Sequence, residues 1–300
     1  MKNLKLGIIG QPLTHTLSPI LHAQIMHQMD IDGVYCKYPL EHDQLRETLQ
    51  QLGQEGVRGL NVTIPHKVAV MGLMDWLSIE ARLAGAVNTI VFDPDTSQPG
   101  NCQTKGHNTD IAGFARSLPP AIVNRLPQMN LLIIGAGGSA RAVLTALIQQ
   151  GATQITFAVR SPEKMVRLIS DAEIMKQTFN SQCQIKTSPL LFMPNLNEFE
   201  GVINTTPVGM WPHTDSSPLS LSQIETLPKK AFIYDLIYRP TETQLLSQAR
   251  SQGLQTFNGL DMLIYQGICS FELWQDRPVP ASLLSSLRQQ LTQAMQHIID

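Results

Sequence analysis

Residues 61–67 read Asn-Val-Thr-Ile-Pro-His-Lys and place a lysine just after a strand-like segment. Asn61 and Thr63 alternate with apolar residues, so in a strand their side chains would share one face. Pro65 is typical of a first helical position, where the helix dipole disfavours a cation such as Lys67 by a few tenths to about 1 kcal/mol. Lys67 is interpreted either as an ordinary solvated surface residue or as a residue with a functional role.

Asp110 supplies a carboxylate that could complete a site with Lys67. It ends the segment Gly-His-Asn-Thr-Asp and lies at the expected hinge between two halves of the chain. A lysine and an aspartate that converge at the mouth of an interdomain cleft would form a proton-transfer pair.

Two hydroxyls precede the first expected helix. Ser18 followed by Pro19 is typical of an N-cap and N1 pair, so the Ser18 hydroxyl is expected to cap the helix. Thr16 lies two residues earlier, and a pair of hydroxyls beside a helix N-terminus would also suit a small carboxylate. The two roles are compatible.

The segment GAGGSA, residues 135–140, follows the apolar run 131–134 and opens a helix. That context is the one required of a dinucleotide fingerprint. Gly135 allows a tight turn, Gly137 lets the backbone approach a pyrophosphate, and Gly138 begins a helix whose N–H groups receive the phosphate. A tight turn without a ligand is the alternative to this predicted nucleotide site.

The end of the next expected strand indicates which nucleotide. NAD-binding folds usually place Asp or Glu there, whereas this chain has Arg160, Ser161 and Lys164, which suit a 2′-phosphate. NADP is therefore predicted over NAD. The alternative makes Arg160 a surface residue and Ser161 the N-cap before Pro162.

The elements that must position these residues form two α/β series. The first has expected strands at 4–10, 34–40 and 59–64, helices at 18–29, 43–52 and from Pro65, and a hairpin over 88–106. The second has an expected strand at 131–134, a helix to Gly151, and further strands within 154–160, 201–210, 231–238 and 254–263. A helix over 281–299 is expected to pack back on the first domain, which would make that domain discontinuous.

Bulk properties narrow the class of protein. A chain of 300 residues suggests two domains. A net charge of −2 and a pI near 6.4 do not indicate a basic surface that would bind nucleic acid or a membrane, so small molecules are the expected partners. Because no apolar run reaches 18 residues, we expect a cytoplasmic protein. A monomer and a homodimer are both compatible with this composition.

The sequence lacks the motifs of other catalytic classes. The four cysteines form no CxxC pair, and the eight histidines include no HExxH, so no metal is expected; His22 and His27 are read as a surface or packing pair. Ser139 follows two glycines rather than forming the G-x-S-x-G elbow of a hydrolase.

A series of motifs resembles the shikimate dehydrogenase family, in order and across nearly the whole chain. They are Thr16-Leu17-Ser18-Pro19, NVTIPHK, AGAVNT (84–89), GHNTD (106–110), IIGAGGSAR (133–141), INTTPVGM (203–210), YDLIY (234–238) and GLDMLIYQG (259–267). The resemblance implies an N-terminal α/β substrate domain, residues 1–107 plus 258–300, and an NADP-binding Rossmann domain, residues 108–257, with a cleft between them. It also implies reversible NADP-dependent reduction of 3-dehydroshikimate to shikimate, a step toward chorismate and the aromatic amino acids.

The resemblance further implies roles for individual residues. Lys67 and Asp110 would be the catalytic pair. The implied substrate-binding residues are Thr16, Ser18, Asn61, Thr63, Asn88, Tyr238 and Gln266. The implied cofactor-binding residues are Gly135, Ala136, Gly137, Gly138, Ser139, Ala140, Arg160, Ser161, Lys164, Thr205, Gly259 and Met262.

Departures from the family pattern keep alternatives open. Thr16 stands where serine is common, Val159 precedes Arg160 where an asparagine is common, and Asp261 replaces a glycine near the expected nicotinamide. A quinate or dual quinate/shikimate dehydrogenase, with NAD as an alternative cofactor, is thus the main competing reading. A catalytically silent metabolite sensor is disfavoured because Lys67, Asp110 and the glycine loop are intact.

Overall fold

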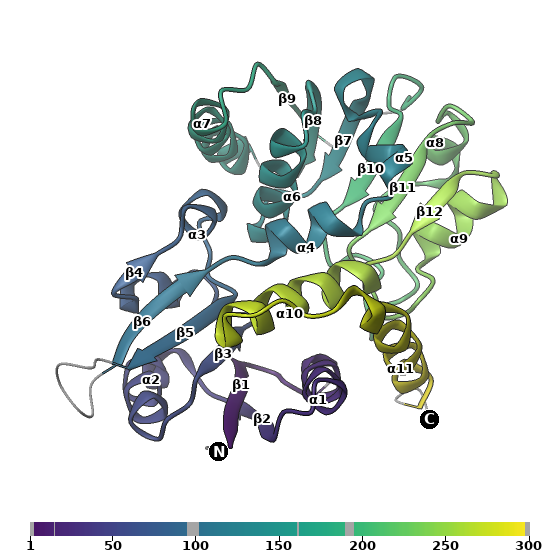
Figure 1. Ribbon diagram of the computed structural model, residues 1–300. Coiled ribbons are helices and arrows are strands. Elements are labelled where there is room, and N and C mark those ends of the chain that lie inside the picture. The colour runs from purple at the N-terminus through teal and green to yellow at the C-terminus, as the bar shows by residue number, and fades with distance from the viewer. Residues whose placement is uncertain (1–2, 15, 95–101, 161, 190–194, 298–300) are drawn as a thin grey trace. The chain divides into compact units, whose positions relative to one another are not determined.

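The computed structural model describes residues 3–14, 16–94, 102–160, 162–189 and 195–297 (Figure 1). The fold is mixed α/β, and the chain divides into two compact units: Met1–Gly113 with Ile264–Asp300, and Phe114–Leu263. The sequence suggested divisions near residues 107 and 258. The chain instead crosses between the units within helix α4 (Asp110–Ser117) and helix α10 (Leu260–Gln275).

The first unit contains a mixed sheet in the order β2-β1-β3-β5-β6-β4. Strands β2, β1 and β3 are parallel, and β5 runs antiparallel to β3 and β6. The strands are β1 (Leu4–Gly10), β2 (Gly33–Pro39), β3 (Gly59–Val62), β4 (Trp76–Leu77), β5 (Thr89–Pro94) and β6 (Cys102–His107). The hairpin predicted over residues 88–106 is confirmed by the β5–β6 pairing.

Helices cover both faces of this sheet. Helix α2 (Leu45–Gln54) buries Leu45, Leu49 and Leu52 in a core shared with Ile9 of β1. Leu6 and Ile8 alternate with Ile9 along β1 and so point to the opposite face. The other helices of the unit are α1 (Ser18–Gln28), α3 (Ile79–Ala84) and α11 (Leu284–His297), with α10 from Ile264 onward.

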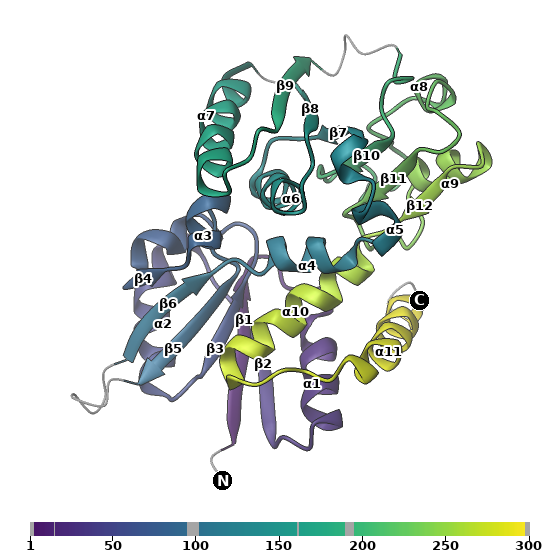
Figure 2. The same ribbon diagram turned by 45° about the horizontal axis from the view of Figure 1, so that its top comes forward.

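Glycines let α10 approach its neighbours closely. A Cβ at Gly59 of β3 would collide with Trp274 of α10, and one at Gly267 of α10 would collide with Leu21 of α1. Helices α1 and α11 lie side by side in Figures 1 and 2. Gln28 Nε2 of α1 donates to Ser286 Oγ of α11 at 2.7 Å. The segment after Ile264 is therefore an integral part of the first unit.

The second unit contains a parallel sheet in the order β12-β11-β10-β7-β8-β9. Its strands are β7 (Asn130–Ile134), β8 (Gln154–Val159), β9 (Gln184–Pro189), β10 (Gly201–Asn204), β11 (Phe232–Asp235) and β12 (Gln255–Phe257). Counted from β7, this is the 3-2-1-4-5-6 order of a dinucleotide-binding fold, and the order reverses between β7 and β10. This strand order confirms the predicted Rossmann class. Ligands of such sheets bind beyond the carboxyl ends of the strands, at the point where the order reverses.

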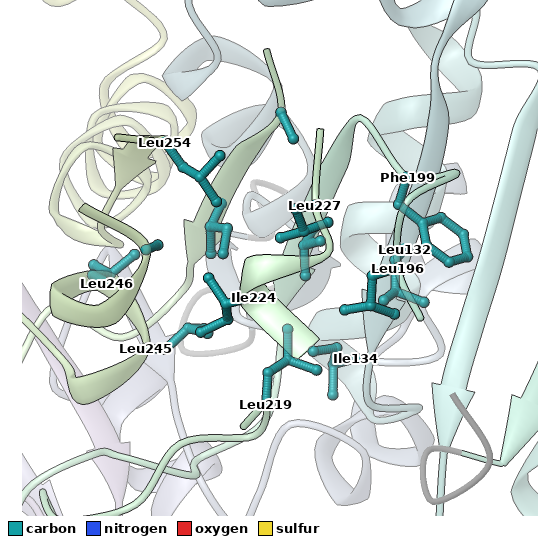
Figure 3. Close-up of a cluster of buried hydrophobic side chains, with 14 of the residues drawn as sticks. Leu132, Ile134, Leu196, Phe199, Leu219, Ile224, Leu227, Leu245, Leu246 and Leu254 are labelled. Carbon is teal, nitrogen blue, oxygen red and sulfur yellow. The ribbon is translucent and has the colours of Figure 1, made fainter. Parts of the chain in front are cut away.

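The four central strands of this sheet, β7, β8, β10 and β11, are buried on both faces, as a doubly covered parallel sheet requires. Leu132 and Ile134 of β7 join a core with α8 (Leu221–Glu225) and α9 (Gln244–Ser251), and Figure 3 shows these side chains gathered in one cluster. Alternation along β7 directs Leu131 and Ile133 to the opposite face. Helices α6 (Gly138–Gln149) and α7 (Pro162–Thr178) lie beside each other in both ribbon views, and the short helix α5 (Pro120–Val123) precedes β7.

The helix predicted from Pro65 is wrong. Strand β3 ends at Val62, the chain turns through residues 63–68, and the next element is a 3-10 helix at Ala69–Leu73. The Lys67 carbonyl accepts from Val87 N–H at 2.8 Å instead of from a residue four positions later. Ile64 is 69% exposed because it lies in this turn rather than in the strand.

Candidate active site

Lys67 and Asp110 meet in the first unit. Lys67 Nζ donates to Asp110 Oδ2 at 2.7 Å, and their side chains are 28% and 12% exposed. Asp110 is the first residue of α4, where the positive end of the helix dipole favours a carboxylate. Because Lys67 lies in a turn, no helix dipole opposes its charge, and the ion pair with Asp110 explains its position.

Asn88 holds the other oxygen of Asp110. Its Nδ2 donates to Asp110 Oδ1 at 2.8 Å, while its Oδ1 accepts from the backbone N–H of Thr109 at 2.7 Å. A backbone N–H can only donate, so this contact fixes which end of the Asn88 amide is oxygen. Asp110 therefore accepts a hydrogen bond at each carboxylate oxygen, one from an ammonium and one from an amide.

A cluster of buried hydroxyls lies behind Asn88, and sequence reasoning missed it. Ser270 Oγ is 2.7 Å from Thr89 Oγ1 and 3.1 Å from Thr109 Oγ1, and those two hydroxyls lie 3.0 and 3.2 Å from Asn88 Oδ1. Thr109 was within a motif already singled out, GHNTD, but nothing in that motif marked its side chain. Ser270 follows Gln266 by four residues, which places both on one face of α10.

Asn61 is the residue whose surroundings differ most from the expected ligand role. It is buried; its Oδ1 accepts from Tyr35 OH at 2.7 Å and lies 3.0 Å from His22 Nε2, and its Nδ2 donates to Ser270 Oγ at 3.0 Å. Protein groups thus occupy both lone pairs and a donor of this amide. Asn61 joins the polar interior of the unit to the hydroxyl cluster.

Thr63 and Gln266 lie at the edges of this polar region. Thr63 is half-buried and directly follows β3. Its methyl group occupies the space that a Cβ at Gly10 would need. Gln266 Oε1 lies 3.5 Å from Asn88 Nδ2, and a Cβ at Gly113 would come within 2.7 Å of Gln266 Cβ. Gly113 therefore lets α4 pack close to the backbone of α10 at Gln266.

Ser18 does not cap helix α1, so that prediction is wrong. The N-cap is Leu17, whose carbonyl accepts from Leu21 N–H at 3.0 Å, and no side chain caps the helix. The Ser18 hydroxyl instead accepts from Thr16 Oγ1 at 3.2 Å and pairs with Tyr35. Burial raises the pKa of Tyr35, so its phenol remains a neutral donor. The expected pair of hydroxyls at the start of α1 is present.

The glycine loop of the second unit fits a dinucleotide. Gly135 follows β7 with φ of +112°, and a Cβ there would approach Thr205 Oγ1 to 2.5 Å. At Gly137, the N-cap of α6, a Cβ would meet no described atom within 4 Å. Gly138 and Ser139 open α6, whose following residues from Ala140 are largely buried, and Ala136 is half-buried in the loop. An open backbone beside a helix N-terminus is the cradle that a pyrophosphate requires.

The residues expected to select NADP are partly described. Arg160 is exposed directly after β8, at the carboxyl end of the strand next to β7. Ser161 lies outside the described residues. Lys164 lies in α7, and its side chain is also outside the described part of the structure. The place of Arg160 matches the position at which such folds distinguish the two dinucleotides.

The loops after β10 and β11 are tied together. Thr205 Oγ1 donates to the Ile134 carbonyl at 2.7 Å, which packs Thr205 under the glycine loop. Asn204 Nδ2 donates to Asp235 Oδ1 at 3.0 Å, and burial raises the pKa of Asp235 to about 6. Tyr238, half-buried, follows in the loop after β11.

Gly259 and Met262 lie at the start of α10. A Cβ at Gly259 would collide with the Leu236 carbonyl, so this glycine is required by backbone packing irrespective of a cofactor. Met262 is buried in the first turn. Asp261 also lies in that turn, where the helix dipole favours its carboxylate. This gives the departure at Asp261 a local physical reason.

Neither a metal site nor a membrane span is found among the described residues. In the ranges that the structure describes, no three His, Cys, Asp or Glu side chains gather as a metal site. Over the same ranges, no helix has the length and hydropathy needed to cross a membrane.

Comparison with known proteins agrees with the motifs. Residues 8–90 match the family model for the shikimate dehydrogenase substrate binding domain. Residues 117–188 match the model for shikimate / quinate 5-dehydrogenase, and residues 259–283 match that for the shikimate 5'-dehydrogenase C-terminal domain.

Curated and solved relatives extend over nearly the whole chain. The NADP(+) shikimate dehydrogenase of Crocosphaera subtropica is 36% identical over 97% of both chains. Among solved structures, a Thermus thermophilus shikimate 5-dehydrogenase in complex with NADP(H) and shikimate has a TM-score of 0.78 at 30% identity, covering 96% of this chain and 99% of that one. A Listeria monocytogenes shikimate 5-dehydrogenase in complex with shikimate and NAD has a TM-score of 0.80 at 29% identity, covering 95% and 96%. With its motifs, fold and relatives in agreement, this chain belongs to the shikimate dehydrogenase family.

Proposed function

We propose that this protein is an NADP-dependent shikimate dehydrogenase that uses Lys67 and Asp110 as its catalytic pair. The observation that carries the proposal is the 2.7 Å contact between Lys67 Nζ and Asp110 Oδ2, with Asn88 holding the second carboxylate oxygen. Family membership supplies the substrate and reaction class, and this geometry supplies the groups that move a proton.

The two side chains divide the acid–base work. In the reduction, Lys67 Nζ donates a proton to the carbonyl oxygen on which negative charge develops, and in the oxidation it accepts the hydroxyl proton. Asp110 orients Nζ and accepts from the substrate hydroxyl. Because Asn88 fixes Asp110 from the other side, the carboxylate is held ready before the substrate binds.

The remaining polar residues of the first unit bind the rest of the substrate. The hydroxyls of Thr16 and Ser18, at the start of α1, hold the substrate carboxylate. Thr63, Asn88 and Gln266 hold ring hydroxyls, whereas Asn61 acts on the ring through the network behind Asn88 rather than by direct contact. Tyr238 of the second unit is a further proposed substrate ligand.

NADP binds at the glycine loop of the second unit. The loop from Gly135 to Ala140 and the N-terminus of α6 receive the pyrophosphate, and Arg160 pairs with the 2′-phosphate together with Ser161 and Lys164. Thr205 supports the loop, and Gly259 and Met262 are proposed to border the nicotinamide. When bound, the nicotinamide supplies or accepts the hydride.

A quinate or dual-specificity enzyme that uses NAD is the second candidate. Thr16 adds a methyl group to the carboxylate end of the site, and the Listeria relative was solved with NAD. One extra ring hydroxyl alters only a contact or two, so both substrates must be compared directly.

The test is a set of initial rates by nicotinamide absorbance that crosses shikimate and quinate with NADP and NAD. We expect shikimate with NADP to give the highest kcat/KM. The Lys67→Ala variant is expected to lose ~10² to 10⁴ in kcat with a smaller change in KM. Faster turnover of quinate or NAD would transfer the assignment to the second candidate, and a fully active Lys67→Ala variant would end the proposed role of Lys67.

A further inference from the structure

The turn that carries Lys67 is held by four hydrogen bonds to three segments of the first unit: the end of β1 (Ile9 to Gln11), Leu40 and Val87. Three are between backbone groups: Thr63 N–H to the Ile9 carbonyl at 3.0 Å, Gln11 N–H to the Ile64 carbonyl at 3.0 Å, and Val87 N–H to the Lys67 carbonyl at 2.8 Å. The fourth comes from a side chain, that of His66. Since backbone bonds cannot be removed by substitution without moving the chain, His66 is the accessible test of what this turn does.

His66 is completely buried beside Lys67. Its Nε2 lies 2.8 Å from the carbonyl oxygen of Leu40, the residue that follows β2. A carbonyl oxygen can only accept, so Nε2 carries the hydrogen. Leu40 is itself buried and its N–H reaches the Gly10 carbonyl at 3.4 Å, so the His66 ring is attached to the carboxyl edge of the central strands.

We propose that His66 is a positioning residue for Lys67. By donating to Leu40, it sets the path of the turn, and the turn sets the point from which the lysine stem reaches Asp110. The inference rests on the proposed acid–base role of Lys67. The lysine stem has a fixed length, so the position of the Lys67 Cα limits which points Nζ can reach. A displacement of about 1 Å at a reacting group can cost up to ~10²-fold in rate.

A purely space-filling role is the competing explanation. His66 has no exposed surface, and a buried apolar side chain of similar volume would then serve equally well. The two explanations differ in one respect: positioning needs a donor at the place of Nε2, and filling needs only volume.

The experiment compares His66→Gln with His66→Leu. The glutamine Nε2 can take the place of the imidazole Nε2 and donate to Leu40, whereas leucine fills the space without a donor. We expect kcat of His66→Leu to fall ~10- to 100-fold with KM for shikimate within about threefold, and kcat of His66→Gln to stay within about threefold of wild type. Should the leucine variant not fold, His66→Asn, whose shorter amide does not reach the Leu40 oxygen, is expected to show the same loss of kcat.

Val70→Ala is the matched control for lost stability. Val70 is completely buried just after the turn, and its N–H bond to the His66 carbonyl is a backbone bond that the substitution keeps. We expect it to lower the melting temperature while kcat is retained. A folded His66→Leu enzyme with wild-type kcat, or equal losses in His66→Gln and His66→Leu, would overturn the inference. Lys67→Ala is measured in parallel: if it is fully active, the proposed function has failed, and not this inference alone.

Discussion

Asp110 is defined by its acceptor contacts. Each of its oxygens has a different donor, Lys67 Nζ on one side and Asn88 Nδ2 on the other. Such an arrangement suits a carboxylate that orients a neighbouring ammonium, since any hydrogen on either oxygen would face a donor.

Replacing Asp110 by asparagine tests this description. The amide keeps the shape but brings an N–H₂ group against either Lys67 or Asn88, and in both orientations Lys67 loses its anionic partner. We expect Asp110→Asn to lower kcat ~10²- to 10³-fold in the initial-rate assay while the protein remains folded. Asp93→Asn, which breaks ion pairs with Lys105 and Arg58 in the same unit, is the control and should retain activity. An active Asp110→Asn enzyme would contradict the assignment.

His22 gives the first unit a built-in acid sensitivity. It is completely buried and stacked on Tyr35 at 4.6 Å between ring centroids, and burial lowers its pKa to about 3. The unfolded chain takes up a proton here below a pH of about 6.5, whereas the folded chain does not. The part of the unfolding free energy that depends on a neutral His22 is therefore intact above a pH of about 6.5. It is lost as pH falls from there toward about 3.

The His22→Phe variant should lack this dependence. Between a pH of about 7.5 and one of about 5.0, the imidazole is expected to cost the wild type about 2 kcal/mol of unfolding free energy, and the variant should not show this component. Urea unfolding at the two pH values measures it. Leu21→Val, a neighbouring buried change on α1, should lower stability equally at both pH values. Identical pH dependence in His22→Phe and wild type would show that His22 is not the titrating group.

At the scale of elements, the glycine loop contains one glycine that the backbone conformation requires and another that is expected to bind the cofactor. Gly135 has a positive φ and lies against Thr205, whereas Gly137 has φ of −86° and open space beyond it. We expect Gly135→Ala to lower the melting temperature and Gly137→Ala to keep it but weaken NADP binding roughly tenfold or more. Thermal melts and calorimetric titration of the two variants measure this. Equal stability loss in both would contradict the distinction.

The sequence predicted the elements that repeat a simple pattern. Apolar runs located β1, β7 and β8, and the glycine loop located the start of α6, because period and turn chemistry are local properties. The helix from Pro65 was predicted wrongly because proline also suits turns, and the outcome depended on bonds to Ile9, Leu40 and Val87, which are distant in sequence.

The site was predicted to a similar extent. The ion pair of Lys67 and Asp110 came from motif chemistry together with the family resemblance. Ser270 and Thr89 could not be found, because hydroxyls on a buried helix face and strand look like ordinary interior serine and threonine until α10 is placed against β5. The Ser18 cap failed because the helix begins one residue earlier than expected: Leu17 is the N-cap, so Ser18 is the first helical residue.

At the scale of the whole molecule, the two units share continuous helices. The unit boundaries fall within α4 and α10, so unfolding of either unit would fray a helix that the other also uses. We expect one cooperative thermal transition. NADP without shikimate is expected to raise its midpoint temperature, because ligand binding to the folded chain adds RT ln(1 + [L]/Kd) to the unfolding free energy, about 2.7 kcal/mol at roughly a hundred times Kd. Scanning calorimetry with and without NADP tests it; two transitions of which NADP moves one would contradict it.

The return of the chain to the first unit at Ile264 has a consequence for synthesis. The ribosome makes β1 to β6 first, then all of Phe114–Leu263, and only then the part of α10 that carries Gln266, Ser270 and Trp274. At ordinary elongation rates the sheet face that Trp274 covers waits on the order of 10 s for its helix. The second unit can therefore be complete while the nascent first unit still exposes an apolar face, and it is during this interval that a chaperone would have most to protect.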